Sequence, residues 1–122
     1  MIKKGILTII MMISAFGIFS FTASSREAKT GKASYYHDKF NGKRTASGEI
    51  FDNSKFTAAH RTLPFGTKIK VTNMKTDESV VVTINDRGPF HSSRVIDLSK
   101  AAFDEIGNLS AGTLLIEYEL ID

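Results

Sequence analysis

The order of apolar and polar residues along the chain predicts several short strands. Residues 67–72 alternate between polar and apolar side chains, and so do residues 114–120, which is typical of strands with one buried face. The β-branched run at 80–84 predicts a strand that is largely buried on both faces. A first short strand is expected at 33–36. Many short strands separated by frequent turns favour a small closed β-barrel, since closure removes exposed sheet edges.

One segment has the pattern of a helix. Ser99 is a good N-cap residue, and Gly107 is expected to end the helix that follows it. Ala102, Phe103 and Ile106 place apolar side chains on one face of that helix. We therefore expect a mainly β domain with one short helix.

The first residues have a different character from the rest of the chain. Lys3 and Lys4 precede an uncharged run at 5–25, which is rich in large apolar residues and ends in small ones. This pattern predicts a secretory signal peptide at 1–25, followed by a linker at 26–32 and a folded domain at 33–122. The alternative is an uncleaved membrane anchor, because the uncharged run is almost long enough to span a bilayer.

Removal of that segment changes what the charge implies. The chain has 16 Lys and Arg and 13 Asp and Glu, so without Lys3 and Lys4 the count is 14 against 13. A nearly neutral domain without a basic cluster is not expected to bind nucleic acid. The sequence contains no cysteine, which excludes disulfides, thiol nucleophiles and cysteine-based zinc sites within it.

Asp86 is the leading candidate for chemistry. It follows the strand predicted at 80–84 and stands in a turn made by Asn85, Arg87, Gly88 and Pro89. A carboxylic acid at the end of a rigid strand can serve as a general acid. A turn-stabilising aspartate with Arg87 as a surface partner fits the same pattern, and the residues alone do not separate the two readings.

Two further residues are weaker candidates. His60 ends a short apolar segment, where it can either orient a ligand or be a half-buried histidine with one hydrogen bond. Glu49 follows a small polar loop and is either a functional or a solvated carboxylate. The three histidines have no metal-ligand spacing, and no serine-hydrolase elbow is present, so we expect neither a catalytic metal nor a serine nucleophile.

Six short motifs together resemble the rare lipoprotein A family. They are GKASYY at 31–36, TASGE at 45–49, TAAHR at 57–61, LPFGT at 63–67, NDRGPF at 85–90 and RVIDLSKAA at 94–102. The resemblance implies a six-stranded double-psi β-barrel related to barwin-like endoglucanases and to expansins. It also implies a lytic transglycosylase, a carbon–oxygen lyase, that cleaves bonds between N-acetylmuramic acid and N-acetylglucosamine in peptide-stripped peptidoglycan and leaves 1,6-anhydro ends.

The resemblance assigns roles to particular residues. Asp86 matches the essential acid, and His60 and Glu49 match the family's other catalytic residues. We expect Arg87, Tyr36, Thr45 and Phe90 to bind substrate, and we expect no metal and no cofactor. The expected partners are glycan strands, with cell-division proteins or amidases as further candidates.

The sequence also departs from the family pattern. Family members often carry a lipobox cysteine and a C-terminal peptidoglycan-binding repeat domain, and the sequence shows neither. We therefore expect an exported protein that is periplasmic or associated with the cell wall, without a membrane anchor after signal cleavage, and not a lipoprotein. His37 replaces the usual glycine. The alternative function is a non-catalytic, expansin-like module that binds glycan or loosens the wall.

Overall fold

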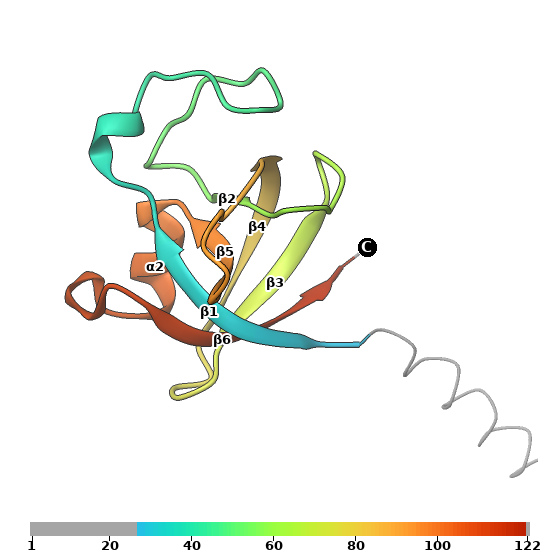
Figure 1. Cartoon of the computed structure of the whole chain (residues 1–122). Coiled ribbons are helices and arrows are strands. Elements are labelled where there is room, and N and C mark those ends of the chain that lie inside the picture. Colours follow the sequence, from blue (N-terminus) through green and yellow to red (C-terminus); the bar gives the residue numbers. More distant parts are fainter. Residues whose placement is uncertain (1–26, 122) are drawn as a thin grey trace, which may run out of the picture.

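The computed structural model describes residues 27–121, which form a closed six-stranded β-barrel (Figure 1). Its strands are β1 (Lys29–Tyr35), β2 (Thr57–Ala59), β3 (Lys68–Asn73), β4 (Ser79–Asp86), β5 (Arg94–Leu98) and β6 (Leu114–Leu120). They follow the order β1-β5-β2-β4-β3-β6 around the barrel, and β6 pairs with β1 to close it. The predicted signal peptide at 1–25 lies outside the described residues.

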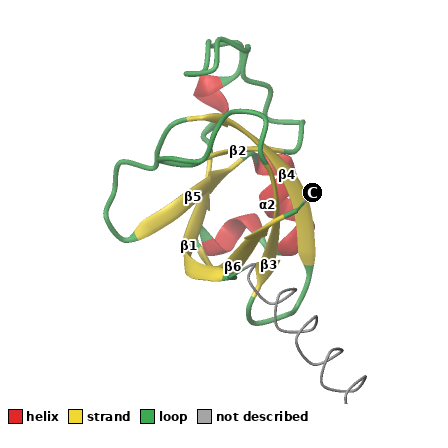
Figure 2. Cartoon of the chain, turned by 90° about the vertical axis from the view of Figure 1, so that its right-hand side faces the viewer, coloured by secondary structure: helices red, strands yellow, loops and turns green. Residues whose placement is uncertain are grey.

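Two parallel strand pairs determine the topology. β1 runs parallel to β5 and β2 runs parallel to β4, whereas the other neighbours are antiparallel. β5 therefore lies between β1 and β2, so strands from the two halves of the chain interleave (Figure 2). The closed, mainly β barrel predicted from the alternation of apolar and polar residues is confirmed.

Branched aliphatic side chains fill the barrel, and one helix packs against it. The most deeply buried of them are Ile69, Val71, Val82, Ile84, Ile96, Leu98 and Ile116. Helix α2 (Lys100–Ile106) buries Ala102, Phe103 and Ile106 completely. The Ala102 amide donates to Ser99 Oγ at 3.2 Å, and Gly107 is the C-cap, so the predicted helix and its cap are confirmed.

Strand β4 differs from the prediction in how it is buried. Val80, Val82 and Ile84 face the interior, whereas the side chain of Val81 is 44% exposed. Over residues 80–84 the strand is therefore fully buried on one face only. The prediction of two buried faces was wrong, because a run of β-branched residues suits the outer surface of a barrel as well as its core.

Strand β1 begins earlier than predicted. It starts at Lys29, so residues 29–32 belong to the barrel and not to a linker. Their backbones pair with β6, from Lys29 opposite Tyr118 to Ala33 opposite Leu114. Polar side chains mark the outer face of the barrel here, and the sequence gives no local sign of pairing with a strand more than 80 residues away.

The long connection between β1 and β2 rises above one end of the barrel (Figure 1). It contains the short 3-10 helix η1 (Asp38–Phe40), and a second one, η2 (Leu109–Ala111), precedes β6. Asn53 fastens the connection. Its Nδ2 donates to the Tyr36 carbonyl and to Asp38 Oδ1, and its Oδ1 accepts from the Lys100 amide at the start of α2. In residues 27–121, no helix has the length and apolar character to cross a bilayer.

Candidate functional site

Asp86 lies at the last position of β4, where its carboxylate accepts three hydrogen bonds. Tyr36 Oη donates to Oδ2 at 2.5 Å. The amides of Ala46 and Arg87 both donate to Oδ1 at 2.9 Å. These donors come from the residue after β1, from the long connection above the barrel and from the residue after β4. The carboxyl group is therefore held in one orientation by segments that barrel closure brings together.

Tyr36 is fixed by aromatic neighbours. Its ring stacks on the buried Phe51 with 4.3 Å between centroids, and it is perpendicular to the ring of Phe40 with 5.9 Å between centroids. Burial of the hydroxyl, together with the hydrogen bond to Asp86, raises the pKa of Tyr36 far above its usual value. The phenol therefore keeps its proton at every physiological pH and acts as a donor to Asp86.

Thr45 and Glu49 build the turn that presents the Ala46 amide. The Thr45 amide and hydroxyl both donate to the Glu49 carbonyl, and the Ser47 amide donates to the carbonyl of Asn85 beside the acid. Gly48 adopts the left-handed conformation with φ of 94°, which a side chain would disfavour. Thr45 is buried and the Glu49 side chain is exposed. Thr45 thus supports the turn, whereas the Glu49 side chain is exposed, and neither residue is among those that line the groove beside Asp86.

The ring of His60 points away from Asp86. Its backbone amide donates to the Asp86 carbonyl, but its Nε2 lies 2.9 Å from Tyr118 Oη on β6. The Nδ1 atom accepts from the amides of Thr62 and Leu63, so the ring proton is on Nε2 and is donated to Tyr118. The ring borders a separate cavity of about 110 Å³. The pKa of His60 is lowered mainly by burial, and further by the nearby charges of Lys29, Arg87 and Arg61. The neutral ring is therefore favoured.

Arg87 braces the segment that follows His60. Its Nη1 donates to the carbonyls of His60 at 3.2 Å and Leu63 at 2.8 Å. Its guanidinium also lies over the ring of Phe65, 4.0 Å from the centroid. The interactions of its guanidinium are therefore largely with the protein, although the residue also borders the groove described next.

A groove of about 660 Å³ runs past the acid. We call it the Asp86 groove. The residues that border it include Tyr36, Phe40, Asp86, Arg87, Phe90 and Arg94. Phe90 is 91% exposed and offers a bare aromatic face at the rim, the kind of surface that packs against a sugar. The structure thus brings Asp86, Tyr36, Arg87 and Phe90 to one groove and turns the His60 ring elsewhere.

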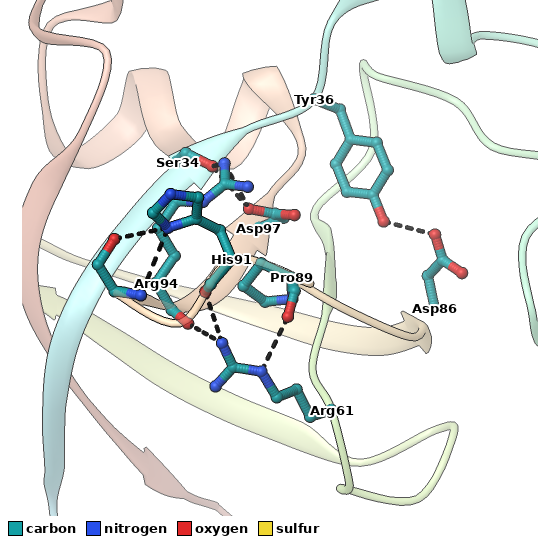
Figure 3. A network of polar contacts seen from close by, with 9 residues as sticks. Ser34, Tyr36, Arg61, Asp86, Pro89, His91, Arg94 and Asp97 are labelled. Carbon is teal, nitrogen blue, oxygen red and sulfur yellow. Dashed lines mark hydrogen bonds and ion pairs between the residues drawn. The ribbon is translucent and has the colours of Figure 1, made fainter.

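A second polar network borders the groove at Arg94 and Asp97 (Figure 3). Ser34 Oγ donates to Asp97 Oδ1 at 2.6 Å, and Arg94 Nη1 donates to the same hydroxyl. On the other side of the loop, the Arg61 guanidinium donates to the carbonyls of Pro89, His91 and Arg94. Neither these contacts nor the role of the Ala46 amide could be predicted from the sequence, because backbone donors and partners distant in the sequence leave no local pattern.

A further hollow of about 400 Å³ near Asn53 is bordered by Lys100 and Asp38, whose Nζ and Oδ2 atoms form an ion pair at 2.8 Å. Because its polar groups fasten the long connection to α2, we assign it a structural role.

Within residues 27–121, no three His, Asp or Glu side chains gather in the way that a metal site requires.

The closed, interleaved barrel is of the double-psi class, as comparison with solved structures shows. A Streptomyces papain inhibitor superposes with a TM-score of 0.65 at 26% identity, covering 79% of this chain and 96% of that one. A mutant expansin of Clavibacter michiganensis in complex with cellohexaose gives 0.64 at 21% identity, covering 79% of this chain and 51% of that one. At such low identity the expansin likeness concerns the fold alone.

The family follows from sequence comparison. Residues 28–118 match the model of a family described as lytic transglycolase, and the chain belongs to that family. It is 48% identical over 109 residues to the endolytic peptidoglycan transglycosylase RlpA of Pasteurella multocida, covering 86% of this chain and 37% of the relative. It is 52% identical over 93 residues to the protein of the same name from Vibrio cholerae, covering 76% and 35%. The resemblance to the rare lipoprotein A family is confirmed, and the chain spans about a third of the length of these curated relatives.

Proposed function

We propose that this protein is an endolytic lytic transglycosylase that cleaves peptidoglycan glycan strands lacking stem peptides. The observation that carries the proposal is the carboxyl group of Asp86, held by Tyr36 and two amides beside an open groove. Relatives that are 48% and 52% identical to the chain in sequence are named for this activity. The action takes place outside the cytoplasm, where the substrate lies.

The proposed reaction needs one acid. Asp86, protonated, donates to the glycosidic oxygen as the bond from the anomeric carbon of N-acetylmuramic acid breaks. The C6 hydroxyl of the same sugar attacks that carbon and its proton passes to Asp86, which regenerates the acid. The products are a 1,6-anhydro end and a free N-acetylglucosamine hydroxyl. Attack within one sugar ring gains from proximity and requires no bound water.

The surroundings of Asp86 suit this role. The Tyr36 hydroxyl and the amides of Ala46 and Arg87 are already directed at the carboxylate that forms when the proton leaves, so they stabilise its charge without rearrangement. Asp97 is the other carboxylate that borders the groove, and it is bound to Ser34 and Arg94. A second carboxylate acting on water, as in most glycoside hydrolases, is therefore not part of the proposal.

The other predicted residues receive distinct roles. Phe90 and Tyr36 contact the sugar. Glu49, which follows the turn that presents the Ala46 amide to Asp86, contacts the glycan strand. Arg87 and Thr45 keep the binding surface in shape. His60 is a positioning residue, since its ring is hydrogen-bonded to Tyr118 while its amide holds the Asp86 backbone.

Location and partners also belong to the proposal. We place the protein in the periplasm or at the cell wall, as an exported protein. An amidase that removes stem peptides is the partner that the chemistry requires, because it supplies the substrate. Cell-division proteins are further candidates for its recruitment.

The product of the reaction tests the proposal. Purified residues 26–122 are incubated with peptide-free glycan strands, and the new chain ends are identified by mass spectrometry. We expect 1,6-anhydromuramic ends from the wild type and none from Asp86→Asn. Ordinary reducing ends would indicate hydrolysis. Binding without new ends would favour the alternative of an expansin-like glycan-binding module.

A further inference from the structure

The Asp86 groove is more basic than the domain that contains it. Residues 26–122 have 14 Lys and Arg against 13 Asp and Glu. The groove, in contrast, is bordered by five Lys and Arg side chains and by two carboxylates, those of Asp86 and Asp97. The five cations are Lys39, Lys43, Arg44, Arg87 and Arg94. A groove of this charge favours a ligand that carries anionic groups.

Three of these cations are already engaged by the protein. Arg94 pairs with Asp97 at 3.5 Å. Arg87 and Arg44 donate to backbone carbonyls. Their charges contribute to the potential of the groove, but their donors are partly taken. The capacity to bind a new anion directly therefore rests mainly with the two lysines.

Lys39 and Lys43 both lie near one aromatic ring at the rim. Their Nζ atoms lie 5.3 and 5.7 Å from the centroid of Phe40, which is 38% exposed. Within residues 27–121, neither ammonium group forms an ion pair. The Phe40 ring packs perpendicular to the ring of Tyr36, whose hydroxyl binds Asp86. An aromatic surface with two ammonium groups thus leads directly to the acid.

We propose that Lys39 and Lys43 bind the free lactyl carboxylate of an N-acetylmuramic acid residue while Phe40 packs against its sugar ring. The inference rests on the proposed function and adds to it the group that selects the substrate. In a peptide-free strand the lactyl ether ends in a carboxylate. In a strand that carries a stem peptide the same carbon is an uncharged amide with a bulky substituent. The two lysines therefore distinguish stripped strands from unstripped ones through this charge.

The test measures binding separately from cleavage. Affinity is measured by calorimetry in the Asp86→Asn background with two ligands, peptide-free strands and the same strands with the lactyl carboxylates converted to methylamides. The lysines are changed together, Lys39→Gln with Lys43→Gln. Lys70→Gln with Lys75→Gln is the matched control, because it removes two exposed charges away from the groove.

We expect the groove variant to bind the free-acid strands about tenfold more weakly, in line with the loss of two exposed ion pairs. Its affinity for the methylamide strands should stay within about twofold, and the control should bind both ligands like the parent. Equal losses for both ligands, no loss for either, or an equal loss in the control would each overturn the lysine subsite.

Cleavage assays on the chain with Asp86 intact separate this inference from the proposed function. If 1,6-anhydro ends form equally fast from free-acid and methylamide strands, the subsite is wrong and the proposed function stands. If no such ends form but the charge-dependent binding persists, the lysines bind the carboxylate and the proposed reaction is wrong. Absence of binding to either ligand overturns the subsite.

Discussion

At the scale of single residues, the most informative contact is the one between the Tyr36 hydroxyl and Asp86. It is short at 2.5 Å, and its donor is held in place by the stack on Phe51. A donor that is oriented before the reaction costs no reorganisation when charge develops on the carboxylate. The contact should therefore contribute to the rate more than to the stability of the fold.

Substitution of Tyr36 by Phe tests this point. It removes the hydrogen bond and keeps the stacked ring, so we expect the cleavage rate to fall roughly 10- to 100-fold with little change in Tm. Tyr35→Phe is the matched control, because its hydroxyl donates to the Leu109 carbonyl and not to Asp86. A Tyr36→Phe enzyme with the wild-type rate would show that the hydroxyl plays no part in the chemistry.

The predictability of the site also differs from residue to residue. The polar turn that contains Asp86 could be predicted, because a strand pattern that stops at polar residues is a local signal, whereas the role of the acid was implied only by the family resemblance. The direction of the His60 ring was not, because it depends on Tyr118, which is 58 residues away. The hydrogen bond from the Ala46 amide could not be predicted either, since every residue except proline has such a donor.

At the scale of elements, local signals predicted α2 well and long-range pairing decided the rest. Ser99 caps the helix through the amide only three residues ahead, so the sequence contains the whole interaction. Residues 29–32 belong to β1 because they pair with β6, and no residue near them in the sequence indicates this pairing. The close approach of β1 to β5 is another such feature, and it depends on Gly31.

Gly31 leaves no room for a side chain. A Cβ atom at this position would lie 2.6 Å from Cγ1 and 2.7 Å from Cγ2 of Val95. We expect Gly31→Ala to lower the free energy of unfolding by about 1–3 kcal/mol, measured by urea titration. Addition of Val95→Ala should recover part of the loss. If the double variant lost the sum of the two single effects, the clash would not be the cause.

Arg61 fixes the loop between β4 and β5. Its guanidinium donates to the carbonyls of Pro89, His91 and Arg94 at 2.8, 2.7 and 2.6 Å (Figure 3). Lysine keeps the charge but cannot reach three carbonyls in a planar fork. We expect Arg61→Lys to reduce stability by about 1–3 kcal/mol and to speed amide hydrogen exchange in residues 90–94. Unchanged exchange there would mean that the loop is held by other contacts.

At the scale of the whole molecule, the bond between His60 and Tyr118 joins the segment after β2 to the far side of the barrel. It requires a neutral His60 ring, because Nδ1 accepts two amide hydrogens while Nε2 donates. Burial lowers the pKa of His60, so protonation is opposed in the folded state. The stability of the entire barrel is thereby linked to pH.

The sign of that link follows from the two pKa values. The unfolded chain binds a proton at this histidine near pH 6.5, whereas the folded chain binds it only at lower pH. Stability is therefore complete above about pH 6.5 and is lost as the pH falls below it. We expect the free energy of unfolding to decrease from about pH 7.5 to 5.5, and to decrease less in His60→Gln. Equal decreases in both proteins would assign the effect to other groups.

The three donors to Asp86 also determine in which state of the chain the acid can act as proposed. They come from residues 36, 46 and 87, which are brought to one point only after β1 and β4 have taken their places in the barrel. An unfolded or half-folded chain carries the aspartate but neither its donors nor the groove. The proposed acid therefore has its three donors and its groove only in the folded barrel, and the cleavage that we propose requires that barrel.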